Sequence, residues 1–211
     1  MKKTLILTLT VAFTQLLFAQ EDDYRDNVSL GAKIGLNLSN VYNSNGDDFV
    51  ANNKLGLAFG GFLTIPIGKT FAIQPEVLLS QKGFQSTGSI LGSNYNLSRT
   101  TTFIDVPILF AFRPTSSISI LAGPQYAYLV KQKDELENNG NITLLQEQQF
   151  KNDNIRKNIL GFIGGVDINV ERIVVSLRAG WDVQTNRGDG TSSTPQYKNV
   201  WYQATIGARL F

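Results

Sequence analysis

Eight charged residues of this 211-residue chain fall on the polar side of segments that otherwise alternate between polar and apolar residues. Four are basic and four are acidic: Lys33, Glu76, Lys82, Asp105, Asp167, Arg178, Asp182 and Arg209. Paired carboxylates could perform acid–base chemistry, but the chain has no histidine and no cysteine. This removes the commonest general base, the commonest metal ligand and thiolate chemistry. We therefore expect a structural network of ion pairs, with no catalytic, cofactor-binding or metal site.

The segment that shows best how such charges are positioned spans residues 158–184. Read in steps of two, it has apolar residues on one side and Asp167, Arg178 and Asp182 on the other, with a break at residues 171–172. Because side chains alternate across a strand, this pattern predicts a tight hairpin with one apolar and one polar face.

Six further segments alternate in the same way: residues 29–38, 55–67, 71–82, 102–112, 118–130 and 199–211. The eight expected strands are joined by short turns and long polar loops in strict alternation. Outer-membrane barrels have short periplasmic turns, long extracellular loops and strands of ~9–11 residues. The sequence predicts an all-β fold, an eight-stranded antiparallel up-and-down transmembrane β-barrel with short periplasmic turns and long extracellular loops.

Four aromatic residues lie on the apolar phase near the loop ends of their strands, as an interfacial girdle does. They are Tyr126, Tyr128, Trp181 and Tyr202. With the apolar face in lipid, the charged residues would fill the interior of a small, porin-like barrel. Eight strands enclose space for side chains or one small ligand, whereas an open channel needs ~16 strands.

The long loop over residues 131–157 is densely charged, and we expect a helical turn near residues 142–150. It also contains apolar residues that a purely solvating loop does not need. Two interpretations stay open, a surface that contacts a partner and a cap packed onto the barrel mouth.

The first residues have the layout of a secretory signal peptide, with Lys2 and Lys3 before an apolar stretch. We expect a signal peptide over residues 1–19, a short periplasmic lead-in over 20–28 and the outer-membrane β-barrel domain over 29–211. Without the two leader lysines, 17 basic and 17 acidic residues remain of the 19 and 17 in the whole chain. No basic stripe supports binding of nucleic acid.

Several segments resemble the PorT-like outer-membrane β-barrel family of Gram-negative bacteria. They are GAKIGLNLS (31–39), QPEVLLSQKGF (74–84), FIDVPILF (103–110) and LAGPQYAYL (121–129), together with the strand that ends at Phe211. The resemblance implies an eight-stranded barrel in the cell outer membrane without enzyme activity or cofactor. One departure concerns Phe211, which is in phase with the inward Arg209. A bulge near Ala208 or a fraying end would reconcile the two.

The leading hypothesis for the function is a non-enzymatic integral outer-membrane protein with a polar lumen filled by side chains. Outer-membrane lipid surrounds it, and the extracellular loops would contact a protein partner, in a surface interaction or a secretion apparatus. Two alternatives stay open. One is a secreted lipocalin-like carrier with the apolar face around a small ligand, and the other is a barrel enzyme acting on lipid or peptide. The oligomeric state is left open.

Overall fold

The computed structural model describes residues 23–45, 51–90, 93–138, 141–148, 156–187 and 196–210. The 3₁₀-helix η1 (Tyr24–Asp26) precedes nine strands. These are β1 (Ser29–Asn45), β2 (Ala51–Ile67), β3 (Phe71–Ile90), β4 (Ser93–Phe112), β5 (Ile118–Asn138), β6 (Asn141–Gln148), β7 (Asn158–Val170), β8 (Ile173–Asp182) and β9 (Gln196–Arg209). Within these ranges, no helix is long and apolar enough to cross a membrane.

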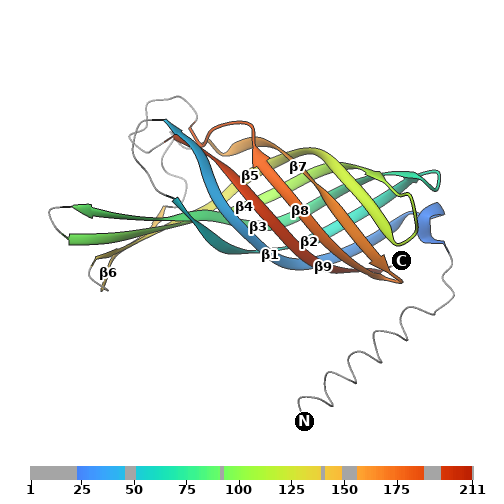
Figure 1. Cartoon of the computed structure of the whole chain (residues 1–211), viewed down its shortest axis with the longest axis horizontal. Helices are drawn as coiled ribbons and strands as arrows, with labels where there is room; N and C mark the ends of the chain where they lie inside the picture. The colour runs from blue at the N-terminus through green and yellow to red at the C-terminus, as the bar shows by residue number, and fades with distance from the viewer. Residues whose placement is uncertain are drawn as a thin grey trace, which may run out of the picture.

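Eight of the strands form a closed barrel (Figure 1). Each pairs antiparallel with its neighbour in the order β4-β3-β2-β1-β9-β8-β7-β5, and a further ladder between β4 and β5 closes the circle. Closure leaves no unpaired edge in the wall, which a structure surrounded by lipid requires. The expected eight-stranded antiparallel up-and-down β-barrel is confirmed.

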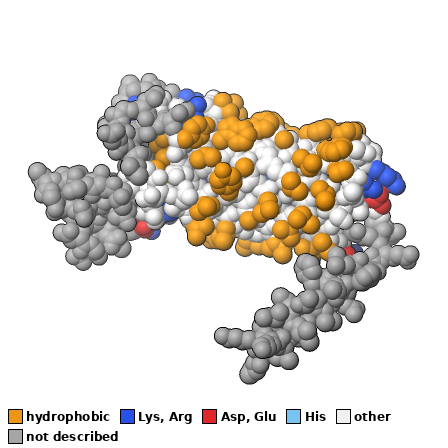
Figure 2. All heavy atoms as spheres, in the orientation of Figure 1, with side chains coloured by type: hydrophobic (Ala, Val, Ile, Leu, Met, Phe, Trp, Pro, Cys, Tyr) orange, Lys and Arg blue, Asp and Glu red, His pale blue; other side chains and the backbone are white. Residues whose placement is uncertain are grey.

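The apolar face of the barrel points outward and the polar face inward. On β8, Val175, Leu177 and Trp181 are exposed, whereas Ser176 and Arg178 are buried. Figure 2 shows apolar side chains covering the middle of the visible barrel wall. The carrier alternative, which needs the apolar face inside, is therefore wrong.

The four aromatic residues expected at the membrane interface all lie on this outer face and are exposed. Tyr126 and Tyr128 stand on β5, Trp181 on β8 and Tyr202 on β9. Aromatic rings at such positions sit at the headgroup level of a membrane. Their expected lipid-facing phase is confirmed.

Several strands are longer than the sequence pattern predicts. β3, β4 and β5 have 20, 20 and 21 residues. Much of the segments 83–101 and 131–157, expected as loops, is therefore paired sheet. The expected helical turn near residues 142–150 is also wrong, because residues 141–148 form β6, which pairs with the end of β5. Pairing along β5 satisfies the backbone groups on one side of this segment.

The last strand keeps its register to the end. Ala208 pairs with Ala32 on one side and with Ile173 on the other, without a bulge, and Arg209 points inward. The bulge considered near Ala208 is therefore absent from this part of β9. Phe211 lies outside the described residues, as do the predicted signal peptide over 1–19 and the first part of the predicted lead-in over 20–28.

Glycine allows close packing at two points of the wall. A Cβ at Gly165 would lie 1.9 Å from the carbonyl oxygen of Leu177, and one at Gly35 would lie 1.9 Å from that of Ala204. Strand interiors need glycine where another backbone approaches this closely. These glycines are part of the tight curvature that a small barrel requires.

Candidate functional site: the charged barrel interior

All eight charged residues predicted for the interior are buried in the barrel, and none is more than 8 % exposed. They come from six strands: Lys33 from β1, Glu76 and Lys82 from β3, Asp105 from β4, Asp167 from β7, Arg178 and Asp182 from β8, and Arg209 from β9. The structure brings six of the eight into three direct ion pairs, Lys33 with Glu76, Asp167 with Arg178 and Lys82 with Asp105.

A central cluster joins four charges across the lumen. Lys33 forms an ion pair with Glu76, and the Nη1 of Arg178 lies 2.6 Å from the Oδ1 of Asp167. The Nη2 of Arg178 is 3.8 Å from the Oε1 of Glu76, so the two pairs are connected. Gln74 adds a hydrogen bond from its Nε2 to the Oε1 of Glu76 at 2.9 Å. Two cations and two anions here compensate each other.

A second cluster lies nearer the long-loop end. The Nζ of Lys82 is 2.9 Å from the Oδ2 of Asp105. The same ammonium lies 3.7 Å from the ring centroid of Trp201 and 5.0 Å from that of Phe103. An ammonium over an aromatic face is attracted by the ring quadrupole, most strongly on tryptophan. Lys82 therefore has one anionic and two aromatic contacts, and Trp201 was not foreseen from the sequence.

Asp182 is held by amide groups. The Nδ2 of Asn199 donates to its Oδ2 at 2.5 Å, and the backbone N–H of Asn199 donates to the same oxygen at 3.3 Å. Its backbone carbonyl accepts from the hydroxyl of Tyr42 at 2.6 Å. Among the described residues its carboxylate makes no ion pair, so Asp182 is held in the interior by these hydrogen bonds.

Arg209 closes the opposite, short-turn end of the interior. Its guanidinium carbon lies 3.5 Å from the ring centroid of Tyr24, and its Nη1 donates to the carbonyl oxygen of Glu171 at 2.9 Å. Its Nη2 donates to the Oδ1 of Asn169. Tyr24 belongs to the lead-in, which therefore folds back under the barrel.

The lead-in is fastened by a residue that the sequence pattern did not single out. Arg113, at the end of β4, is buried, and its Nη2 donates to the carbonyl oxygens of Gly68, Phe71 and Arg25 at 2.8, 2.8 and 3.0 Å. The hydroxyl of Tyr24 donates to the carbonyl oxygen of Ser116 at 2.6 Å. The alternation of polar and apolar residues stops before Arg113, which follows β4. The sequence pattern therefore gives no sign that this arginine is buried or that it contacts the lead-in.

The long-loop end is closed by an ion pair that was also missed. Arg99 and Asp134 form two parallel hydrogen bonds, Nε to Oδ1 at 2.7 Å and Nη2 to Oδ2 at 2.8 Å. Tyr197 lies beside them, with its hydroxyl 3.4 Å from the Nη1 of Arg99 and its ring edge-on to Phe84. Both charges stand in segments expected to be loops, which is why the strand pattern did not reveal them.

A small cavity lies at the lead-in end of the interior. A cavity of about 10 Å³ lies above the lead-in, among residues that include Tyr24, Gln74, Arg113 and Asp167. This is room for about one water molecule. Within the described ranges, no group of three or more histidine, cysteine, aspartate or glutamate residues could hold a metal ion. Around this cavity, the described side chains are thus closely packed.

A closed barrel with an apolar outer wall and a filled, charged interior defines a small integral outer-membrane β-barrel protein. The model of the family described as outer membrane protein beta-barrel domain matches residues 18–181, and the chain belongs to this family. The protein is located in the outer membrane.

Solved structures of small outer-membrane barrels resemble the chain at low sequence identity. Neisserial surface protein A is 10 % identical, with a TM-score of 0.48 and coverage of 86 % of this chain and 98 % of that one. Ail, the attachment invasion locus protein of Yersinia pestis, is 12 % identical, with a TM-score of 0.47 and the same coverage. OprG from Pseudomonas aeruginosa is 10 % identical, with a TM-score of 0.37 and coverage of 87 % and 94 %. No curated protein sequence matches this chain.

Proposed function

We propose that the protein is a non-enzymatic outer-membrane barrel that binds a protein partner through a sheet projecting from its extracellular end. The observation that carries the proposal is the length of three strands. β3, β4 and β5 have 20, 20 and 21 residues, whereas a tilted strand crosses a membrane in ~9–11. About half of each strand therefore stands outside the bilayer.

The projecting part is a continuous sheet. The ladder between β3 and β4 runs from Phe71↔Phe112 to Ile90↔Ser93, and β4 stays paired with β5 as far as Tyr95↔Asn138. β6 adds a fourth strand along the end of β5 (Figure 1). A hydrogen-bonded sheet presents a fixed surface, which lowers the entropic cost of binding a partner compared with a mobile loop.

The interior supports the non-enzymatic part of the proposal. Its carboxylates contact ammonium, guanidinium or amide groups, and the chain contains neither histidine nor cysteine to act as base or nucleophile. A general base must reach the proton that it abstracts. The cavity beside Asp167 has room for about one water, which is too little for a substrate.

Within the family, we assign the chain to the PorT-like branch on residues 74–84 and 103–110. These motifs coincide with interior contacts, since Gln74 hydrogen-bonds to Glu76 and Lys82 pairs with Asp105. Participation in a secretion apparatus is one form that binding through the projecting sheet could take. The surface itself is the same in either setting.

The test removes residues 138–149 at the tip of β5 and in β6 and follows two readouts in cells. Surface crosslinking of the intact protein should capture a partner, and the shortened protein should fold and insert but lose that crosslink. The matched control substitutes Lys69→Ala in the periplasmic turn after β2, which should keep the crosslink. A shortened protein that folds and still captures the partner would overturn the proposal. One that fails to fold would show that the segment is a packed cap.

A further inference from the structure

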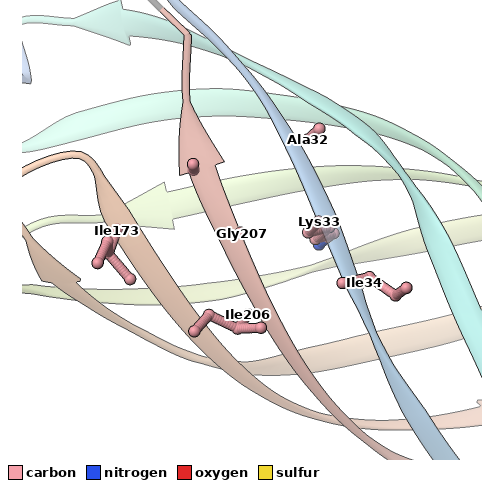
Figure 3. A pocket seen from close by; sticks show the side chains of 7 residues that line it. Ala32, Lys33, Ile34, Ile173, Ile206 and Gly207 are labelled. Carbon is pink, nitrogen blue, oxygen red and sulfur yellow. The ribbon is translucent and has the colours of Figure 1, made fainter.

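The lipid-facing wall has a groove near its periplasmic end, between β1, β8 and β9. Its volume is about 420 Å³, and it is lined by Ala32, Lys33, Ile34, Ile173, Ile206, Gly207 and Ala208 (Figure 3). Lys33 directs its ammonium to Glu76 in the interior, so the exposed lining is apolar. The groove is continuous with the outer surface that the membrane covers.

The shape of the groove follows from the strand register. Ala32 pairs with Ala208, and Ala208 pairs with Ile173, so two methyl groups form the floor beside one isoleucine. In the next row, Ile34 pairs with Ile206 and forms the opposite wall. Larger side chains therefore border a floor of small ones, which leaves a narrow, concave apolar depression.

The position of the groove along the membrane normal matches that of the first carbons of a phospholipid acyl chain. Ala32 lies three residues into β1, which begins at Ser29, or about 10 Å along the strand at ~3.3 Å per residue. With a strand tilt of roughly 40°, this is about 8 Å above the periplasmic end of the barrel wall. Such a position lies just inside the apolar part of the inner leaflet.

Two residues of opposite charge directly precede Ile173, which lines the groove. Glu171 and Arg172 form the turn between β7 and β8, directly before Ile173, and Arg172 is exposed. Glu171 has a φ of 49°, and its carbonyl oxygen is held by Arg209. Neither side chain forms an ion pair within the described ranges. A guanidinium suits a phosphate and a carboxylate suits an ammonium group.

We propose that this groove is a binding site for one phospholipid of the inner leaflet with a primary-amine headgroup, such as phosphatidylethanolamine. One acyl chain lies over Ala32 and Ala208, the phosphate meets Arg172 and the headgroup ammonium meets Glu171. A second copy of the barrel fits less well, because its convex wall would touch the isoleucine walls and leave the alanine floor uncovered.

The experiment measures lipid retention by native mass spectrometry of the folded protein, released from mixed micelles. The probes are phosphatidylethanolamine, phosphatidylglycerol and phosphatidylcholine with identical acyl chains. The wild-type protein should retain one phosphatidylethanolamine in preference to the other two. Ala32→Leu should weaken this retention about tenfold, because it displaces the equivalent of roughly two buried methylene groups.

The matched control is Ala122→Leu. Ala122 is also a lipid-facing alanine near the periplasmic end, but it stands on β5, four strands away from β1 in either direction. This variant should bind lipid like the wild type. If Ala32→Leu does not fold, Ala208→Leu tests the same floor from β9.

The charges are tested separately. Arg172→Gln should weaken retention of every phospholipid about fivefold, as expected for one basic residue near a membrane surface. Glu171→Gln should leave phosphatidylglycerol retention intact and remove the preference for phosphatidylethanolamine.

Three results would overturn the proposal: no headgroup preference in the wild type, equal loss in Ala32→Leu and Ala122→Leu, or a dimer that the groove-filling variants abolish.

Discussion

At the scale of single residues, the stability of the barrel depends on buried charges being paired, because an unpaired buried charge would destabilise the folded state. Asp167 and Arg178 are 2 % and 3 % exposed, and their closest oxygen and nitrogen are 2.6 Å apart. Burying an ion costs several kcal/mol unless a partner compensates it. The alternating pattern was enough to predict which residues face inward. It could not predict the partners, because these come from strands distant in sequence and depend on side-chain reach across the lumen.

We predict that Asp167→Ala lowers the free energy of unfolding by ~3 kcal/mol, the lower end of the range for breaking a buried ion pair. Among the described residues, Arg178 would keep one anionic partner, Glu76, whose Oε1 is 3.8 Å from its Nη2. The midpoint of urea unfolding in lipid vesicles measures the change. Val166→Ala, at the neighbouring outward position, should shift the midpoint much less. Equal midpoints for the wild type and Asp167→Ala would contradict the stabilising role of the cluster.

At the scale of elements, the lead-in shows how a short segment can close one end of the barrel. η1 places Tyr24 under Arg209, and the adjacent Asp23 and Arg25 hold each other through hydrogen bonds of 2.8 Å. The existence of the eight barrel strands was predictable, since each buries one side and exposes the other. The docking of the lead-in was not, because three helical residues carry no periodicity.

The pH dependence of this closure follows from Asp23. The hydrogen bond from Arg25 is the main cause that lowers the pKa of Asp23 from 3.8 to about 2. A carboxyl whose pKa is lowered in the folded state stabilises it above the unfolded pKa and loses this effect as pH falls through the folded value. We expect hydrogen exchange of the Arg25 amide to stay slow from pH 7 down to 3.8 and its protection to fall between 3.8 and about 2.

The control is Asp23→Asn, in which the protection of the Arg25 amide should no longer change in this pH window. A second acid, Asp26, lies 3.3 Å from Lys69 and is left unchanged by this substitution. If the protection of the Arg25 amide depends on pH in Asp23→Asn as it does in the wild type, a group other than Asp23 controls the docking of the lead-in.

Among the elements, the projecting sheet was not predicted from the sequence, which indicated loops in its place. Residues 83–90, 93–101 and 131–138 are mostly polar, and no regular apolar phase marks them as strand. They pair nonetheless, because each extension continues a ladder that the barrel has already started. For the same reason β6 forms where a helical turn was expected.

At the scale of the whole molecule, the sequence was sufficient for the class of fold and for the outer membrane as location. Closure at both ends, by Tyr24 with Arg113 and by Arg99 with Asp134, emerges only from the structure. The interior clusters lie between these two sets of contacts, and the cavity above the lead-in holds about 10 Å³. Among the described residues, side chains from different strands thus meet inside the barrel at several levels.

We predict that the purified protein carries no steady ionic current in a planar lipid bilayer at neutral pH. Eight strands leave an interior that side chains can fill, whereas a conducting lumen needs ~16. The measurement is single-channel recording, with an established open porin in the same bilayer as a positive control. Discrete, lasting conductance steps from the folded protein would contradict a filled interior.

The long ladder between β3 and β4 also has a mechanical consequence. It joins the periplasmic turn at residues 68–70 to the tip near Ile90 and Ser93 through a single hairpin. Twenty residues of extended strand measure about 66 Å at ~3.3 Å per residue, and the part beyond the bilayer reaches about 30 Å. The lower part of the hairpin belongs to the barrel wall and is fixed in the membrane, whereas its upper part projects from it. A pull on its tip along the strands loads many hydrogen bonds in shear at once, so a bound partner would be held at a fixed height even under tension.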